Sequence, residues 1–228
     1  MAKPPAPKSS SQDITAFLRK SRDITEFLGQ QPRLLFAIDA TASRQPTWDQ
    51  ACHLQQAMFR ASGKVASLAV QLCYYRGFGE FQASPWLTDS DALARRMGQV
   101  HCEGGHTQIA RLLRHARAEH ARADIRALVF IGDAIEENPD TLCDLAGQCG
   151  IVKLPLFLFQ EGRHPLVEQS FRTMARVSGG AYARFDGSSA EVLAGLLGAV
   201  ASYARGGRAA LEELKGESAK LLLQQLKS

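Results

Sequence analysis

Apolar and amphipathic stretches alternate along the chain from Arg33 onward. The apolar stretches are consecutive runs of the kind that form buried strands, and they cover residues 34–38, 65–75, 127–131, 154–159 and 181–185. The amphipathic stretches have helical spacing, and they cover residues 48–62, 90–97, 107–123, 139–149, 165–177 and 189–203. Because strands that alternate with helices need crossover connections, this pattern predicts a three-layer α/β/α domain with a mostly parallel, doubly wound sheet.

One further segment predicts a strand of a different kind. Residues 81–87 are partly apolar and contain Pro85, which cannot donate a backbone hydrogen bond to a neighbouring strand. We therefore expect one short strand at an edge of the sheet.

The N-terminal residues lack the alternation of the rest of the chain. The first dozen are mostly Pro, Lys and Ser, a composition that cannot bury enough apolar surface to become ordered. Residues 13–18 and 23–28 then repeat the pattern DITxFL, in which an Asp that can cap a helix precedes apolar residues. We expect a disordered tail followed by two short amphipathic turns.

The C-terminal residues form a separate pattern beyond a pair of glycines at 206 and 207. Four leucines lie on an approximate helical stripe, at positions 211, 214, 222 and 226. This stripe predicts a helix that docks on the domain or on a partner. The expected organisation is therefore a tail with the amphipathic repeat over 1–30, one domain over 31–205 and a C-terminal helical extension over 206–228.

Composition narrows the class of protein. A chain of 228 residues with 45% hydrophobic residues is long enough for one globular domain with short tails. Its net charge of +4 is too small to indicate nucleic acid or an anionic membrane as a partner. No apolar run approaches the length of a membrane span, and the N-terminus has no apolar core of a secretory signal. These features predict a soluble cytoplasmic protein.

The cysteines carry no recognisable site. They are five in number, contain no CxxC pair and fall mostly within regular segments. An odd number without paired spacing disfavours both a disulfide framework and a zinc knuckle. We expect them to be reduced thiols.

Polar side chains follow the predicted strands at the edge where ligands of parallel sheets collect. Asp39, Thr41 and Ser43 come after the first strand at every second position, so their side chains can converge in an extended loop. Asp133 follows a later strand, and Thr107 begins a helical run after two glycines. Two carboxylates and three hydroxyls are hard oxygen donors, which suit Mg²⁺ or Mn²⁺ and not zinc.

This set of residues resembles the metal-ion-dependent adhesion site of the von Willebrand factor type A (VWA) domain family. That site has the pattern Asp-x-Ser-x-Ser, then a distant Thr, then an Asp after a hydrophobic strand. The resemblance runs from about residue 33 to 203, with Asp39, Thr41 and Ser43 on the first element, Thr107 on the second and Asp133 on the third.

Two departures from the family pattern keep every donor. Thr41 stands where Ser is usual, and Ala134 follows Asp133 where the family often has Gly. The resemblance implies the same three-layer fold and a bound Mg²⁺ or Mn²⁺. It also implies that the hydroxyls contact the ion directly or through water, with the two acids binding the ion or its waters.

Each of these residues alone has a simpler interpretation. Asp39 and Asp133 after strands could be turn residues, and Thr107 could be a helix cap.

Other candidate residues indicate less. The histidines at 101, 106, 115 and 120 lack the spacing of metal ligands, although His106 could line the site. Basic residues on the 107–123 helix lack the interleaved aromatic residues that stack on bases, which disfavours nucleic acid as a partner.

Two functions from different classes remain. The first is a non-catalytic protein-interaction module, in which a bound ion with an open position is completed by an Asp or Glu of a partner protein. The family implies an adaptor or assembly factor, often beside an AAA+ ATPase. The alternative is a Mg²⁺-dependent phosphohydrolase or phosphotransferase, whose sheet also carries an Asp after its first strand. Such enzymes use Asp-x-Asp, and Thr41 cannot replace the second acid as a proton donor or acceptor at neutral pH.

Overall fold

The computed structural model describes residues 31–44, 68–186 and 190–226. Its contacts divide the chain after Gln31, and the larger unit, Pro32–Ser228, carries the fold. The DITxFL repeat and the helix predicted over 48–62 lie outside the described residues.

The unit is built on a six-stranded sheet. The strands are β1 (Arg33–Asp39), β2 (Ala69–Arg76), β3 (Glu80–Ala83), β4 (Ile125–Gly132), β5 (Leu156–Glu161) and β6 (Ala181–Phe185). Their order is β3-β2-β1-β4-β5-β6, and β3 pairs antiparallel with β2 while the other neighbours pair parallel. The predicted mostly parallel, doubly wound sheet with one short edge strand is confirmed.

The edge strand is shorter than the predicted 81–87. β3 ends at Ala83, because the Ser84 side chain, rather than a further strand residue, accepts the Leu72 N–H at 3.0 Å. After Pro85 the chain returns to β2 only through an isolated antiparallel bridge between Leu87 and Val70. Pro85 thus limits the strand in the way its missing N–H requires.

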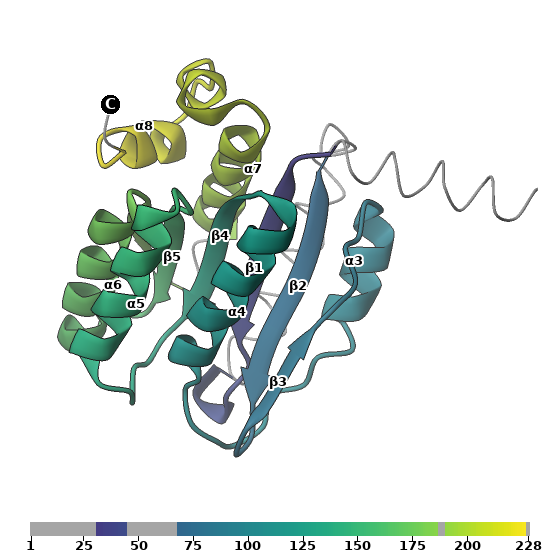
Figure 1. Ribbon diagram of the computed structural model, residues 1–228, viewed down its shortest axis with the longest axis vertical. Coiled ribbons are helices and arrows are strands. Elements are labelled where there is room, and N and C mark those ends of the chain that lie inside the picture. Colours follow the sequence, from purple (N-terminus) through teal and green to yellow (C-terminus); the bar gives the residue numbers. More distant parts are fainter. Residues whose placement is uncertain (1–30, 45–67, 187–189, 227–228) are drawn as a thin grey trace, which may run out of the picture. The chain divides into compact units, whose positions relative to one another are not determined.

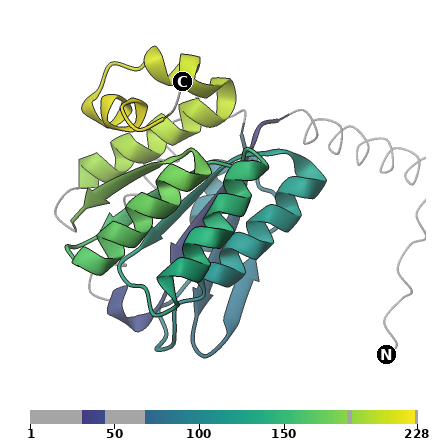
Figure 2. The same ribbon diagram turned by 60° about the vertical axis from the view of Figure 1, so that its left-hand side comes forward.

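Helices cover both faces of the sheet (Figures 1 and 2). They are α3 (Ser90–Met97), α4 (Ile109–Ala123), α5 (Pro139–Ile151), α6 (Pro165–Ser178), α7 (Ala190–Glu212) and α8 (Glu217–Leu223). The central strand alternates between two buried clusters. Phe36 and Ile38 pack in the cluster that holds α3, α7 and α8, whereas Leu35 and Ala37 pack in the cluster that holds α4, α5 and α6. The expected three layers follow from this alternation.

The C-terminal residues belong to the same core. α7 continues past the predicted end at 203 and bends at Gly206 and Gly207, where the backbone leaves helical geometry. Leu211, Leu222 and Leu226 are buried in the cluster on the α7 face. One part of the predicted stripe is wrong, since Leu214 is 38% exposed. The segment forms the end of α7 and a separate α8, so a single helical spacing does not describe it.

Beyond α8, a side-chain amide pairs with the outer edge of the sheet. Gln225 accepts the Tyr182 N–H through Oε1 at 2.9 Å and donates to the Tyr182 carbonyl through Nε2 at 2.9 Å. Tyr182 lies in β6, the last strand of the sheet order. The Gln225 amide therefore forms the two hydrogen bonds that a neighbouring strand residue would form.

Two further expectations concern membrane-spanning helices and the cysteines. Within the described residues, no helix combines the length and apolar character needed to cross a membrane. The described cysteines are free thiols, as expected, at positions 73, 102, 143 and 149. Cys52 lies outside the described residues.

Candidate metal centre

The predicted site residues lie at the switch point of the sheet. β1 and β4 are neighbours at its centre, and the order continues from β1 to β2 on one side and from β4 to β5 on the other. Asp39 is the last residue of β1, and Asp133 directly follows β4. The carboxyl ends of these two strands therefore bring both acids to the crevice where doubly wound sheets bind ligands.

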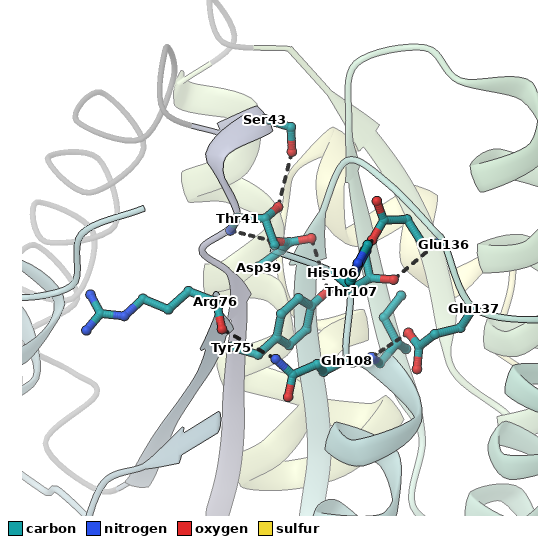
Figure 3. A network of polar contacts seen from close by, with 11 residues as sticks. Asp39, Thr41, Ser43, Tyr75, Arg76, His106, Thr107, Gln108, Glu136 and Glu137 are labelled. Atoms are coloured by element: carbon teal, nitrogen blue, oxygen red, sulfur yellow. Dashed lines mark hydrogen bonds and ion pairs between the residues drawn. The ribbon is translucent and has the colours of Figure 1, made fainter. Parts of the chain in front are cut away.

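The first element of the site is held together by its own side chains (Figure 3). Asp39 is fully buried, and its Oδ1 accepts the Thr41 N–H at 2.8 Å. The 3-10 turn η1 (Ala42–Arg44) then brings Ser43 back, so that its Oγ lies 3.2 Å from Thr41 Oγ1. Asp39, Thr41 and Ser43 are brought together, although by this turn and not by the extended loop that the alternating spacing suggested.

A tyrosine that sequence analysis missed holds the other oxygen of Asp39. The Tyr75 hydroxyl donates to Asp39 Oδ2 at 3.0 Å, and the tyrosine is almost completely buried. Tyr75 lies opposite Asp39 in the β1–β2 register. A polar aromatic residue at the end of the neighbouring parallel strand was the available signal.

Burial raises the pKa of the Asp39 carboxyl above its ordinary value of 3.8. The charge of Asp133 raises this pKa further, while the hydrogen bonds from Thr41 and the charge of Arg44 oppose the rise. The pKa of Tyr75 is also raised, by burial first and by the charge of Asp39 next. The site thus brings negative charge into a buried setting that favours a compensating cation.

Asp133 has a buried side-chain oxygen, Oδ1, that lacks a hydrogen-bond partner among the described residues. Buried carboxylate oxygens are normally paired, because leaving one without a partner costs its full desolvation. An oxygen of this kind beside a second buried acid fits a bound divalent cation.

Thr107 is positioned by the loop that follows Asp133. Its N–H donates to Glu136 Oε2 at 2.9 Å, and its Oγ1 accepts the Glu136 N–H at 3.0 Å. Thr107 is buried, and this reciprocal pair of hydrogen bonds with Glu136 fixes its position. Its hydroxyl hydrogen and remaining lone pair are available for another contact.

Thr107 does not cap the following helix, although a cap was the simpler interpretation of its position. α4 begins at Ile109, and the carboxylate of Glu137 accepts the N–H groups of Ile109 and Ala110 at 2.7 and 2.8 Å. This acid lies in the loop after β4 and satisfies helix donors from outside the helix. Together Glu136 and Glu137 connect the loop after β4 to the segment that carries Thr107 (Figure 3).

A close approach of two glycines brings the segment before Thr107 over the sheet edge. Glu103 forms a parallel bridge with Thr41, and its N–H donates to the Ala40 carbonyl at 3.0 Å. A Cβ on Gly105 would lie 1.9 Å from the Gly77 carbonyl oxygen, so only glycine fits there. This contact explains why a glycine directly precedes the His106–Thr107 pair.

A buried ion pair completes the surroundings of the site. Arg44 is 1% exposed, and its Nη2 lies 3.1 Å from Glu161 Oε2 at the end of β5. Sequence analysis missed Glu161. The polar pair Gln160 and Glu161 at the end of an apolar run was the signal for it.

The histidines play other parts. His106 Nδ1 lies 3.1 Å from Glu136 Oε2, and its ring contacts that of Phe78, so His106 is at the rim of the site as expected. His115 contacts Gln71 at 2.9 Å on another part of the sheet, and burial lowers its pKa. Within the described ranges, no three His, Cys, Asp or Glu side chains are grouped as a metal site. The candidate centre differs from such a group because three of its five side chains are hydroxyl groups.

No family model and no curated protein matches the sequence. Solved structures do match the fold, at low sequence identity. The vWF domain of the type V pili tip protein Mfa5 from Porphyromonas gingivalis has a TM-score of 0.63 at 11% identity, covering 81% of this chain and 97% of that one. The SpRpn10 VWA domain has a TM-score of 0.53 at 11% identity, covering 70% and 90%.

A third match is an aerotolerance-related membrane protein from Bacteroides fragilis NCTC 9343. Its TM-score is 0.54 at 16% identity, and the alignment covers 70% of this chain and 94% of that one. At such low identities these likenesses show the fold alone. The chain has the three-layer α/β/α fold of VWA domains, as the resemblance in sequence implies.

Proposed function

We propose that this protein is a protein-interaction module whose binding site depends on a divalent cation, Mg²⁺ or Mn²⁺. The cation would be held by Asp39, Thr41, Ser43, Thr107 and Asp133. The observation that carries the proposal is the buried, unpartnered Oδ1 of Asp133 beside the buried Asp39.

The chemistry of the donors supports a hard cation. Two carboxylates and three hydroxyls are oxygen donors only, and this is the donor type that Mg²⁺ and Mn²⁺ prefer. Asp39 already uses both oxygens within the protein, so its charge would act mainly as part of the surrounding shell. The exposed Ser43 and the free capacity of Thr107 are the better placed groups for direct contact.

The partner is proposed to present an Asp or Glu side chain. A cation supplies an electrophilic position at the protein surface, and a carboxylate neutralises more of its charge than a neutral group does. The exposed His106 and Phe78 lie at the rim, where the rest of a partner loop would contact the protein. We propose that the module serves as a cytoplasmic adaptor or assembly factor.

The rival phosphohydrolase would need a second acid at position 41. Thr41 instead hydrogen-bonds its backbone N–H to Asp39 and lies with its hydroxyl against Ser43. An Asp39 carboxylate that accepts two hydrogen bonds is also a poor nucleophile, because those bonds stabilise its lone pairs. The interaction module is therefore the better supported function.

Metal binding tests the proposal directly. Titration calorimetry with MgCl₂, and thermal unfolding in Mg²⁺ or EDTA, should show saturable binding and a rise in melting temperature. A cation at about 100 times its Kd stabilises the folded state by about 2.7 kcal/mol. Asp133→Asn keeps the shape of the side chain and removes its charge, so it should abolish the rise.

Glu213→Gln is the matched control, since Glu213 is an exposed acid in the C-terminal part of the chain. It should bind Mg²⁺ like the wild type. An unchanged melting temperature in Mg²⁺ for the wild type would refute the site. Hydrolysis of p-nitrophenyl phosphate by the wild type, lost in Asp39→Asn, would instead support the rival enzyme.

A further inference from the structure

A cavity lies at the opposite end of the sheet from the candidate metal centre, where the parallel strands begin. It has a volume of about 480 Å³ and is lined by residues at the start of β4, before β5 and at the bend in α7. β4 runs from one end of the sheet to the other. Its eight residues, at about 3.3 Å per residue, place the cavity roughly 25 Å from the metal centre. The 3-10 turn η1 and the bent end of α7 accordingly lie at opposite ends of the sheet in Figure 1.

The cavity is strongly basic. Arg126, Lys153 and Arg205 line it, and Asp124 is the one acid among its lining residues. No carboxylate in the described part of the chain forms an ion pair with Arg126 or Lys153. Among the described residues, Arg126 and Lys153 therefore reach the cavity without the acidic partner that surface cations commonly have.

A histidine among the lining residues lies between two backbone carbonyl groups. His120 Nδ1 lies 3.0 Å from the Ile125 carbonyl oxygen, and its Nε2 lies 2.9 Å from the Val152 carbonyl oxygen. These two contacts hold the His120 ring in place where it borders the cavity.

The walls of the cavity are built and are not merely a gap between surface side chains. Gly207 has φ 64° and ψ −152°, a conformation that only glycine adopts readily, and it bends α7 where it borders the cavity. Tyr203 forms another wall and is fixed by ring contact with Phe157 at 5.2 Å between centroids. Burial raises the pKa of Tyr203, and the nearby charge of Arg126 opposes that rise.

We propose that this cavity binds a small phosphate-bearing ligand. Its volume lies within the range of small-molecule sites, about 300–1,000 Å³. Guanidinium groups bind phosphate through paired, charge-assisted hydrogen bonds, and the Lys153 ammonium adds a point charge. An adjoining hollow of about 410 Å³ shares His120 and Val152 with the cavity. Ala118 and Ala121 give it apolar space for the organic part of such a ligand, and Arg114 and Arg117 complete its lining.

Inorganic pyrophosphate is the probe for this site. Titration calorimetry on the full chain uses EDTA, to keep cations from the metal centre, and about 150 mM NaCl, to screen weak surface attraction. The wild type should bind one pyrophosphate with a Kd below about 1 mM. Arg126→Gln and Lys153→Gln should each weaken binding about tenfold or more, which corresponds to about 1.4 kcal/mol.

Two control variants establish that binding is specific to this cavity. Arg163→Gln removes an exposed cation elsewhere and should change the Kd less than twofold. Asp133→Asn should also leave the Kd unchanged, so the cavity can fail or succeed independently of the metal centre. Equal melting temperatures of the wild type and the Arg126 and Lys153 variants would show that the variants fold.

Three results would overturn the proposal. The first is that pyrophosphate shows no saturable binding at concentrations up to about 5 mM, because a Kd above that concentration is too weak for a small-molecule site. The second is an equal loss in Arg163→Gln, which would mean that binding is a general effect of charge. The third is tighter binding of a deca-glutamate peptide than of pyrophosphate with the same dependence on Arg126, which would make the cavity part of a surface for acidic proteins.

Discussion

Replacing Glu137 by alanine should destabilise the protein by more than an ordinary surface change. Glu137 is half-buried and comes from the loop after β4, yet its carboxylate accepts the N–H groups of Ile109 and Ala110. These are the first two residues of α4, and α4 has no side-chain cap of its own at Gln108. Glu137→Ala therefore removes the external cap of this helix and its link to the Asp133 loop.

The size of the effect follows from the two hydrogen bonds that the substitution removes. Loss of a side-chain cap costs about 0.5–2 kcal/mol, and the favourable position of a negative charge at a helix N-terminus is worth about 0.3–1 kcal/mol more. Because this carboxylate holds two N–H groups at 2.7 and 2.8 Å, we expect a loss near the upper end, about 2–3 kcal/mol. For a chain of this length the melting temperature should fall by about 5–10 °C.

Urea unfolding followed by circular dichroism measures this loss, with two comparison variants. Glu137→Gln keeps one acceptor oxygen and loses the charge, so it should lose about half as much stability. Glu136→Ala removes a more exposed carboxylate that accepts the Thr107 N–H and should cost about 1 kcal/mol or less. A loss below about 1 kcal/mol for Glu137→Ala, or one no greater than for Glu136→Ala, would mean that water satisfies the start of α4.

Two further changes test the site. The folded state holds the Asp39 proton more tightly than the unfolded chain does, so stability without metal should fall as the pH rises from about 3.8 through the raised pKa. Asp39→Asn should therefore raise the free energy of unfolding at pH 7 in EDTA, lose this advantage at low pH and no longer respond to Mg²⁺, all of which urea unfolding at several pH values measures. Gly105→Ala places a Cβ against the Gly77 carbonyl and should cost about 1–3 kcal/mol and weaken Mg²⁺ binding in calorimetry, whereas Gly104→Ala, with no atom within 4 Å, should leave Mg²⁺ binding unchanged.

The parts of the fold that sequence analysis predicted are those with a local physical cause. β1 and β4 are buried on both faces, so their apolar residues run consecutively and mark the strands. Asp39 and Asp133 follow those runs, and parallel pairing of β1 with β4 then brings them to one edge. The alternating pattern predicted parallel strands, and the strand order of the structure, with β1 beside β4, then places the two acids together.

The parts that sequence analysis missed depend on contacts between distant segments. Glu161 meets Arg44 because β5 pairs with β4, and no local pattern around Arg44 indicates a buried ion pair. Glu137 caps a helix that begins nearly thirty residues earlier, so the usual search for a cap beside the helix finds only Gln108. The stripe that included Leu214 failed because the chain changes direction between α7 and α8, which ends one helical spacing and begins another.

The Gln225 amide has a consequence for association between copies of the chain. An uncovered edge strand is a template on which another molecule can add its own strand, which leads to dimers and insoluble aggregates. Gln225 occupies the Tyr182 N–H and carbonyl, the groups in β6 that such a strand would need first. A chain that ended before α8 would expose those groups together with part of the apolar surface under Leu222. We therefore expect the last dozen residues to limit self-association, and purified protein lacking them should elute from a sizing column ahead of the monomer.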